Sequence, residues 1–395
     1  MSRLALLEGL LAHNRERGLS TAIWGEGAAE AASQAVDQHP VSASGGPTAY
    51  RLDTPLDLGY SIRCDAPERL HFPVRGGSCG RETSPLTLEV ALLRNACVRW
   101  WHGYHLVLQG EAVVADASSA YWPLSGGALA SSGVAAMQAG DQSLDLPKAF
   151  LVCDDLDMTN FCHFICDLLP KIALAQECSR RIPIVIEAPT QPFQRELLEM
   201  VQRKHGHPLV PLEAGVELKV QRLFYLRRTG HTHPLLRCSG LAMQWVRGLV
   251  DAKPQQAPEG SILYLGRRGR RVITNEAEVI AALQELSGSL TVECELERLG
   301  VRQQAERLLQ HETVVGPHGA SFTHLLFAHQ APARAVEIMG EGNGSLAFAL
   351  ISGRLGIDHN ISVAKATASD QGPNFPNLEA NVESLISLVS ASRRG

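Results

Sequence analysis

The chain has 395 residues, of which 45% are hydrophobic and 19% are charged, and its formal net charge is -5. This length predicts two domains, or one large α/β domain with an extension, and the composition is that of a globular protein with an ample core. The slightly acidic charge gives no support for nucleic acid as the main partner. No apolar run reaches the roughly 18 residues that a transmembrane helix needs, so we expect no transmembrane segment.

Cysteine usage and the first residues bear on the compartment. The nine cysteines are scattered and form no CxxC pair, which favours buried, reduced thiols. Cys162 and Cys166 flank His163 at helical spacing, but a zinc site needs more ligands, so we expect no metal there. The start of the chain lacks the long apolar core of a secretory signal. We therefore expect a cytoplasmic protein whose contact with the inner membrane is at most peripheral.

The first part of the chain gives few structural signals. Residues 1–45 are predicted to form an amphipathic helix followed by a flexible Ala/Ser/Gly-rich segment. Residues 46–150 are rich in Gly, Pro and Ser, and they predict either a β-rich extension or a mixed sheet. The candidate strands in this part are Leu86–Leu93, Ala96–Trp100, His105–Val107 and Ala112–Asp116.

An α/β pattern begins near residue 149 and completes an N-terminal domain over residues 46–250. A strand at Ala149–Cys153 is followed by an apolar-striped helix that Thr159 or Asn160 can cap. The strands expected next are Ile182–Glu187 and Val220–Leu226, and the helices are Gln194–His205 and Leu236–Val250.

His163 and Asp167 in the first of these helices are candidate catalytic residues. They are four positions apart, so they share one face of the helix and can meet. A carboxylate beside an imidazole fixes its tautomer and raises its basicity, as a general base requires. A structural His–Asp pair that ties neighbouring segments together explains the same spacing, so both interpretations stay open on these residues alone.

Asp155 and Asp157 form a short acidic pair of the kind with which many sugar transferases hold a divalent metal. Three-residue matches of this kind are common by chance. The second half of the chain also offers arginines and a helix start, which can neutralise a leaving diphosphate without metal. We therefore expect no metal site and no cofactor beyond the substrate itself.

The second half of the chain begins with a linker over residues 251–260, which contains two prolines. Strands and helices then alternate over residues 261–370, which predicts an open, doubly wound parallel sheet. The expected strands are Ile262–Leu265, Leu290–Cys294, Thr313–Val315 and Ala335–Ile338, and the helices are Glu276–Leu286, Val301–Leu309, Ala320–Phe327 and Ser345–Leu355. A last helix within residues 371–395 is expected to pack back on the first domain.

The stretch Thr313–Ser321 predicts an anion-binding turn. Three β-branched residues form a buried strand, Gly316-Pro317 ends it, and small residues then open an apolar helix. Free backbone N–H donors and the positive end of the helix dipole favour a diphosphate there. The alternative is a turn that needs glycine only for its geometry. The candidate binding residues are Gly316, His318, Gly319, Ala320 and Ser321.

Two further strand ends carry residues suited to a nucleotide. Arg267, Arg268 and Arg271 follow Ile262–Leu265 and could grip phosphate oxygens with bidentate geometry, although a solvated basic loop is the common alternative. Glu337, one residue before the predicted end of its strand, could accept two hydrogen bonds from a ribose diol. Because ligands of such sheets bind outside the carboxyl ends of the strands, these residues predict one nucleotide site.

Three segments together resemble glycosyltransferase family 61, including its bacterial members of the capsular-polysaccharide biosynthesis type. The segments are Asn160–Pro170, Tyr264–Glu276 and Val315–Phe327, the last followed by Val336–Ile338. Their order and spacing match the family over residues 150–360, and the third segment is the most specific.

The resemblance implies a GT-B-like α/β fold, in which two Rossmann-like domains face a cleft; the N-terminal β-rich extension would be additional. It implies an inverting glycosyltransferase, a hexosyl- or pentosyltransferase, that moves a sugar from a nucleotide-sugar donor to a glycan acceptor in surface or capsular polysaccharide biosynthesis. It also implies that the Arg267/Arg268/Arg271 loop and the Gly316–Ser321 turn hold the donor diphosphate. His163, supported by Asp167, would then deprotonate the acceptor hydroxyl.

Two other functions fit part of the pattern. A non-catalytic subunit of a polysaccharide assembly complex would bind a nucleotide sugar or glycan with the same residues and leave the base unused. Slow release of nucleoside diphosphate from a nucleotide sugar would favour the enzyme. A dinucleotide oxidoreductase is disfavoured because no G-x-G-x-x-G follows a strand.

Overall fold

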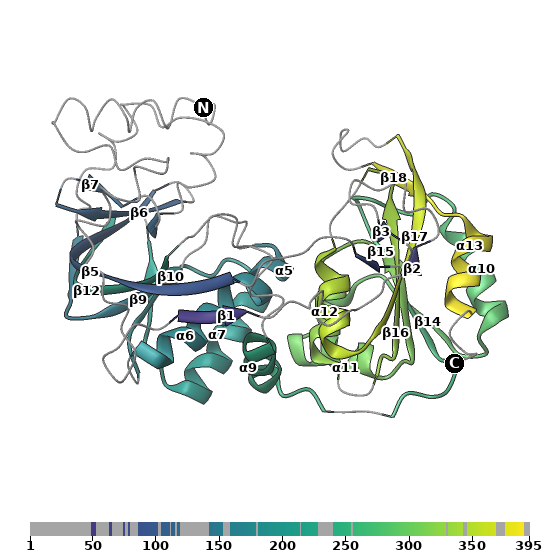
Figure 1. The fold of residues 1–395 in the computed structure, drawn as a ribbon, viewed down its shortest axis with the longest axis horizontal. Helices are drawn as coiled ribbons and strands as arrows, with labels where there is room; N and C mark the ends of the chain where they lie inside the picture. The colour runs from purple at the N-terminus through teal and green to yellow at the C-terminus, as the bar shows by residue number, and fades with distance from the viewer. Residues whose placement is uncertain are drawn as a thin grey trace. The chain divides into compact units, whose positions relative to one another are not determined.

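The chain forms two compact units, each built on its own sheet (Figure 1). The first unit draws on Met1–Arg51 and Leu86–His233, and the second on Leu52–Pro85 and Pro234–Gly395. The computed structural model describes residues 49–52, 63–64, 74–75, 78–79, 86–101, 104–110, 112–114, 117–118, 142–152, 159–178, 181–213, 215–227, 240–253, 256–328, 331–342, 346–368 and 376–390. The predicted N-terminal helix and the acidic pair Asp155 and Asp157 lie outside these residues.

The first unit has a mixed sheet in the order β11-β10-β9-β12-β5-β6-β7, with β1 beside β5 and β8 beside β12. Strands β9 to β12 of the α/β part run parallel to one another, whereas β5, β6 and β7 are antiparallel. The β-rich segment therefore joins the α/β sheet, which is the mixed-sheet alternative. The strands are β1 Ala49–Leu52, β5 Leu86–Trp101, β6 Tyr104–Gln109, β7 Ala112–Val113, β8 Gln142–Leu146, β9 Ala149–Leu151, β10 Ile184–Glu187, β11 Leu209–Leu212 and β12 Val216–Arg227.

Strand β5 replaces two strands that the sequence predicted separately. Asn95, between them, has a left-handed φ of 53°. Pairing with β12 nevertheless keeps one register on both sides of it, because Ala96 lies opposite Val220 and Arg94 lies opposite Arg222. Strand β5 thus continues through Asn95, because its pairing with β12 and β6 holds the backbone in place.

The helices of the first unit are α5 Phe161–His163, the π-helix η4 Phe164–Leu168, α6 Leu169–Cys178 and α7 Pro192–His205. Asn160 caps α5, as predicted, and its side chain accepts hydrogen bonds from the N–H groups of Cys162 and His163. The wide π turn directly precedes Pro170, which has no N–H and whose ring would clash with an α-helical carbonyl. The proline thus stays inside a continuous helical segment.

The second unit has the strand order β14-β13-β15-β16-β17-β18, with β2 beside β17. From β14 to β17 all neighbours are parallel, which confirms the predicted parallel sheet. Numbered along the chain, these five strands follow the order 2-1-3-4-5 of a common doubly wound sheet, whose switch point lies between β13 and β15. The strands are β2 Arg63–Cys64, β13 Ile262–Leu265, β14 Leu290–Glu293, β15 Thr313–Pro317, β16 Arg334–Gly340, β17 Asp358–Thr367 and β18 Asn377–Glu379.

Helices cover both faces of this sheet, with α11 and α12 on one face and α10 and α13 on the other (Figure 1). The core on the α10 face includes Tyr264, Val315 and Ile338 from the strands and Leu283 and Leu385 from the helices. The helices are α9 Gly240–Val250, α10 Glu276–Leu286, η5 Leu296–Arg298, α11 Val301–Leu309, the 3-10 helix η6 Ala320–Phe327, α12 Ala347–Leu355 and α13 Val382–Ser390.

Two helices bear on the expected domain bounds. Helix α9 was expected in the first domain; it packs on η6, buries Met243 and Val246, and is grouped with the second unit. Helix α13 was expected to pack back on the first domain. Within the second unit it packs on α10, β16 and β17, because Leu385 and Val389 belong to the core of that unit.

Candidate functional site

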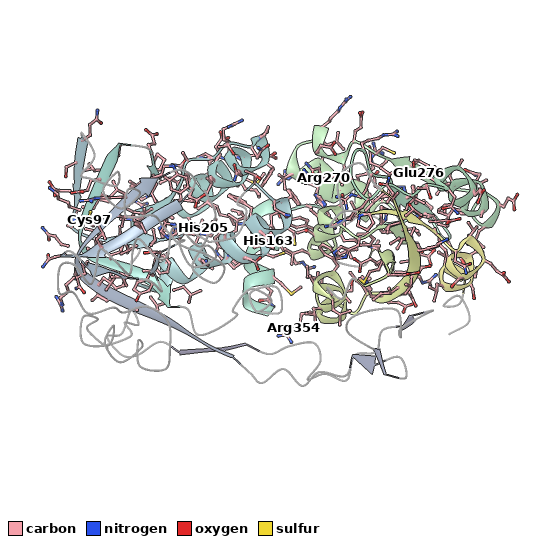
Figure 2. The ribbon with its side chains drawn as sticks, turned by 90° about the horizontal axis from the view of Figure 1, so that it is seen from above. Cys97, His163, His205, Arg270, Glu276 and Arg354 are labelled. Atoms are coloured by element: carbon pink, nitrogen blue, oxygen red, sulfur yellow. The ribbon has the colours of Figure 1, made fainter. Side chains whose placement is uncertain are left out.

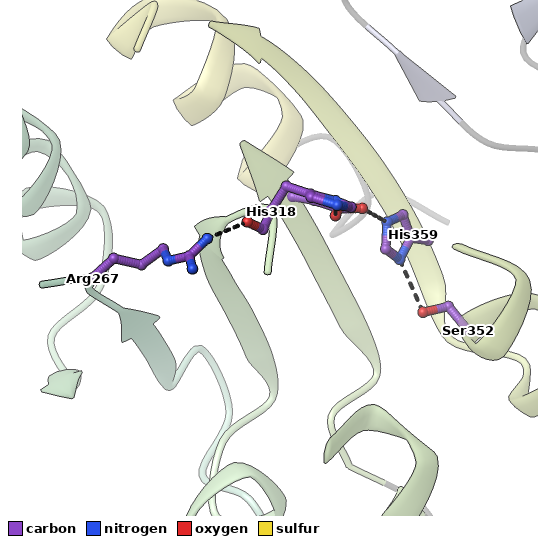
Figure 3. Close-up of polar contacts among 5 residues, drawn as sticks. Arg267, His318, Ser352 and His359 are labelled. Carbon is purple, nitrogen blue, oxygen red and sulfur yellow. Dashed lines mark hydrogen bonds and ion pairs between the residues drawn. The ribbon is translucent and has the colours of Figure 1, made fainter. Parts of the chain in front are cut away.

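Two predicted motifs meet at the carboxyl ends of the neighbouring parallel strands β13 and β15. Arg267 follows the end of β13, and His318 follows the end of β15. Nη1 of Arg267 donates a hydrogen bond of 2.7 Å to the backbone carbonyl of His318 (Figure 3). The arginine loop and the glycine-containing turn therefore share one edge of the sheet, at its topological switch point.

Two glycines make this approach possible. A Cβ at Gly319 would lie 2.7 Å from Nη1 of Arg267, so the glycine leaves room for the guanidinium. A Cβ at Gly316 would lie 2.7 Å from the carbonyl oxygen of Leu265, so that glycine lets β13 and β15 pack closely. Gly316 remains within β15, opposite Glu337, and the strand continues through Pro317, although the sequence predicted that it would end at Gly316. Gly316 thus allows the close packing of two strands, whereas Gly319 leaves space for the side chain of Arg267.

The segment after Gly319 presents backbone donors at this edge. The first N–H groups of a helix have no partner inside it, and the described backbone hydrogen bonds include none from the N–H of Gly319, Ala320 or Ser321. Ala320 and Ser321 are half-buried. Because η6 is a 3-10 helix of eight residues, individual N–H groups offer more to an anion here than the dipole of a long α-helix would.

Helix η6 is held in place by a buried histidine. Nε2 of His324 lies 2.8 Å from Oε1 of Gln304 in α11, and its Nδ1 lies 2.8 Å from the carbonyl oxygen of Ser321. Burial lowers the pKa of His324 to about 4, although the Ser321 carbonyl opposes that shift. Contacts from both ring nitrogens thus connect η6 to α11 and anchor the turn.

The arginine loop concentrates positive charge beside the turn. Burial, and then the nearby Arg271 and Arg270, lower the pKa of Arg267 to about 10. Burial and then Arg270 also lower the pKa of Arg271, whose backbone has a left-handed φ of 53°. Arg268 and Arg270 are exposed, and Arg270 is labelled on the second unit in Figure 2. In the described part of the chain, neither Arg267 nor Arg268 pairs with a carboxylate, so a bound anion would relieve this crowding of like charges.

The far end of the arginine loop is tied to the segment around β18. The N–H of Thr274 donates to the carbonyl of Leu378 at 2.8 Å. The Asn275 side chain donates to the carbonyl of Ala380 at 2.9 Å and accepts from its N–H at 3.0 Å. These bonds limit how far the loop can move from the strand ends.

Glu337 occupies a different place from the one that the sequence predicted. Strand β16 continues to Gly340, so Glu337 lies inside the strand with a fully buried side chain. One carboxylate oxygen is hydrogen-bonded to Nδ1 of His318, and the other lies 3.0 Å from Nε2 of His359. Each carboxylate oxygen of Glu337 thus faces one histidine within the sheet, and its contact with a ribose stays a prediction.

The charge of Glu337 fixes protons on its neighbours. Burial by itself raises the pKa of this carboxyl. His318 and then His359 lower the pKa by more than burial raises it, so that it falls to about 2. An ionised carboxylate only accepts hydrogen bonds, so Nδ1 of His318 and Nε2 of His359 are both donors. The side chain of His318 is 12% exposed, and its ring packs on Phe348 at a centroid distance of 5.2 Å.

The predicted contact between His163 and Asp167 is present in the first unit. Nδ1 of His163 lies 2.8 Å from Oδ2 of Asp167, and the side chains are 29% and 3% exposed, respectively. Phe161 and Phe164 beside them pack edge-on against Phe193 of α7, at centroid distances of 5.2 and 5.6 Å. Figure 2 shows His163 on its helix. The pair has the geometry in which a carboxylate sets the tautomer of an imidazole.

Sequence reasoning missed two residues of this constellation. His359 in β17 reaches Glu337, and Ser352 in α12 lies 2.9 Å from Nδ1 of His359. Strand β17 was not predicted, because it begins with Asp358, His359 and Asn360, which are polar although the last two are fully buried. The alternation of Ile361 and Val363 after His359 was the signal that could have placed this histidine on the apolar face of a strand.

Comparisons with known proteins bear on the use of this site. No curated protein matches the chain significantly. Among solved structures, a mutant flavo di-iron protein from Thermotoga maritima matches with 9% identity and a TM-score of 0.26, covering 87% of this chain and 99% of its own. A flavoprotein from the same organism matches with 10% identity and a TM-score of 0.25, covering 88% and 98%. Scores this low carry no argument about fold or function.

Within the described residues, no helix is long and apolar enough to cross a membrane. Residues 161–336 match the family model described as Glycosyltransferase 61. The matched segment runs from the start of α5 into β16, so it contains His163, Asp167, the arginine loop and the turn after β15. Over this part, which is less than half of its length, the chain is similar to glycosyltransferase family 61, and the match supports glycosyltransferase activity.

Proposed function

We propose that this chain is an inverting glycosyltransferase that transfers a hexosyl or pentosyl group from a nucleotide-sugar donor to a glycan acceptor, in surface or capsular polysaccharide biosynthesis. The observation that carries the proposal is the contact between Arg267 and the His318–Gly319 turn at the switch point of the second unit. The family match supports sugar transfer as the use of this site. The proposal includes a GT-B arrangement, in which the second unit binds the donor and the first unit the acceptor.

The donor diphosphate is the part of the substrate that this site suits best. Arg267, Arg268 and Arg271 supply guanidinium donors, and the N–H groups after His318 supply backbone donors. Negative charge develops on the diphosphate as the sugar leaves it, so these donors bind the transition state more tightly than the ground state. We expect Arg271→Ala to lower turnover by about two decades or more in a folded variant.

The acceptor is activated by His163 in this proposal. Asp167 holds the proton on Nδ1, so Nε2 of the neutral ring can take the hydroxyl proton of the acceptor. The acceptor oxygen then bonds to the anomeric carbon while the bond to the diphosphate breaks. A single displacement of this kind inverts the configuration at that carbon.

Metal is not required in this proposal, because the arginine loop and the backbone donors can offset the charge of the leaving diphosphate. We expect full activity in the presence of a chelator such as EDTA. A complete loss of turnover that added Mg²⁺ or Mn²⁺ restores would contradict this expectation and would show that a metal ion helps to offset the charge of the diphosphate.

The proposal is tested by adding nucleoside diphosphates and nucleotide sugars to the full chain and measuring the melting temperature and the heat of binding. A ligand that binds only the folded state raises the melting temperature. Arg267→Ala should weaken binding of the stabilising nucleotide at least tenfold, which corresponds to about 1.4 kcal/mol. Arg298→Ala is the matched control, because Arg298 is 74% exposed and pairs with Glu295.

Two outcomes would contradict the proposal. The donor site is wrong if no nucleotide stabilises the chain, or if both arginine variants bind equally well. Binding without any hydrolysis of the bound nucleotide sugar, with or without glycan acceptors, would instead favour the non-catalytic binding subunit.

A further inference from the structure

A chain of four hydrogen-bonded polar side chains leads from the strand end into the second unit. It runs from His318 after β15 through Glu337 in β16 and His359 in β17 to Ser352 in α12 (Figure 3). Glu337, His359 and Ser352 are fully buried. They also lie beyond residue 336, where the match to the family ends.

The hydrogen-bond roles along this chain follow from the charge of Glu337. As an acceptor, its carboxylate requires a proton on Nε2 of His359. In a neutral ring Nδ1 of His359 then has a lone pair, which accepts a hydrogen bond from the hydroxyl of Ser352; the Oγ–Nδ1 distance is 2.9 Å. Ser352 and Glu337 therefore specify the same tautomer and the same ring orientation for His359.

The same reasoning applies at the outer end. Nδ1 of His318 donates to Glu337, so its Nε2 is directed away from the carboxylate. In the described structure Nε2 of His318 has no hydrogen-bond partner and is not enclosed. Arg267 meanwhile binds the backbone carbonyl of this residue, so both the main chain and the ring of His318 are held. A histidine fixed in this way presents one nitrogen in a defined direction, next to the turn whose backbone carbonyl Arg267 binds.

A stability role alone does not account for this arrangement. A fully buried carboxylate is costly to desolvate, and apolar residues of similar size often serve a core as well or better. Neighbouring positions on this face are apolar, such as Phe322 and Phe348, whose rings lie 5.9 Å apart. Glu337 and His359 thus occupy buried positions among apolar neighbours, and the hydrogen bonds that they make lead to the ring of His318.

We propose that His359 and Ser352 are positioning residues that act through Glu337 to hold His318, with Nδ1 protonated and Nε2 directed at the diphosphate of the donor. The assignment of the diphosphate rests on the function proposed above, whereas the positioning of His318 does not. Loss of the N–H group of His359 leaves one oxygen of Glu337 without its buried hydrogen-bond partner, so the carboxylate and the ring of His318 become free to shift.

Three substitutions of His359 distinguish the effect of its N–H group, the hydrogen-bond donor to Glu337, from the effect of the volume of its ring. His359→Gln keeps an N–H group near the position of Nε2, within reach of Glu337. His359→Asn keeps polarity, but its amide is too short and stays near Ser352. His359→Leu keeps only volume. His311 is the control site, because it is a buried histidine of the same unit whose ring nitrogens contact other groups.

The test uses the full chain labelled with ¹⁵N-histidine and records which ring nitrogen of His318 carries the proton, with His318→Asn identifying the signals. The dissociation constants for inorganic pyrophosphate, uridine diphosphate and guanosine diphosphate are measured alongside. We expect the wild-type chain and His359→Gln to keep the Nδ1–H tautomer. In His359→Asn and His359→Leu we expect mixed tautomers and about tenfold weaker binding of whichever of these anions the wild-type chain binds.

The outcomes separate this inference from the proposed function. An unchanged His318 tautomer in folded His359→Asn overturns the positioning role, whatever the chain binds. If His359→Leu does not fold, the comparison of the glutamine and asparagine variants decides the question. Failure of all three anions to bind the wild-type chain contradicts the donor site, while the tautomer measurement still decides the positioning. Equal effects of the same substitutions at His311 would show a general loss of stability and would also overturn the inference.

Discussion

Among the described residues, the first unit has the pair His163–Asp167 and the second has His318–Glu337, and the two pairs are built in different ways. His163 and Asp167 are four residues apart on one helical segment, and His163 is 29% exposed. His318 and Glu337 are 19 residues apart, because His318 follows strand β15 and Glu337 lies in the neighbouring strand β16, and the carboxylate is fully buried. Both use Nδ1 of the histidine, so in each case the carboxylate leaves Nε2 for other partners.

The difference shows what each pair is suited to do. The helical pair needs only local spacing, and its more exposed ring can meet a substrate hydroxyl. The pair in the sheet shares its carboxylate with His359, so its position depends on three strands at once. We infer that the first pair is suited to moving a proton and the second to holding one group in a fixed direction.

The comparison is tested most strongly by removing each histidine. His163→Ala should lower turnover by about two to four decades, because a general base contributes that much, while nucleotide binding stays unchanged. His318→Ala should weaken nucleotide binding instead. Steady-state kinetics and calorimetric titration of nucleotides measure the two effects. Loss of nucleotide binding in His163→Ala would place that histidine in the donor pocket and reverse the assignment.

The second comparison concerns the carboxylates. Glu337→Gln should lower the free energy of unfolding by about 3–5 kcal/mol, because two buried N–H donors lose the charge that they face. Asp167→Asn should cost less, because the ring of His163 is partly exposed to water. Urea denaturation of both variants gives the values. Equal losses of free energy of unfolding in the two variants would mean that burial and the contact with His359 do not make the pair in the sheet more stabilising.

Acid should weaken the pair in the sheet within a defined range of pH. The pKa of Glu337 is about 2 in the folded chain and 4.5 ordinarily, so the folded state favours the ionised form. The resulting stability is fully present above pH 4.5 and is lost as the pH falls toward 2.

The measurement is the free energy of unfolding of the wild-type chain minus that of Glu337→Gln, recorded between pH 6 and the lowest pH at which both still fold. This difference should shrink on acidification, by an amount approaching about 3 kcal/mol. Glu297→Gln, at an exposed glutamate, is the control and should show no such change. A difference that stays constant down to the acid limit would contradict the buried ionised carboxylate.

The smallest effects concern the two glycines. Gly316→Ala places a Cβ against the backbone of β13, so it should cost about 1–3 kcal/mol of stability. Gly319→Ala meets only the end of the flexible Arg267 side chain, so it should change stability little but weaken nucleotide binding several-fold. Denaturation and nucleotide titration of both variants separate the two. A larger loss of stability in Gly319→Ala would reverse the roles assigned to the glycines.

The sequence predicted the local elements of the second unit well. Helices α10 and α11 and strand β13 have the predicted bounds, because their apolar periodicity and flanking residues are unambiguous. The prediction was wrong where a strand carries buried polar residues, as in β17, and where packing outweighs a glycine or proline, as in β15. Element type follows from local pattern, but strand ends depend on neighbouring strands.

Local spacing alone was enough to predict the contact of His163 with Asp167, because residues four apart on a helix share one face. It also placed Arg267 and His318 after strands of one parallel sheet. That these strands are neighbours, and that Glu337 is buried between two histidines, became known from the folded chain. The physical reason is that strand order and side-chain burial arise from contacts between residues far apart in the chain, which no local spacing encodes.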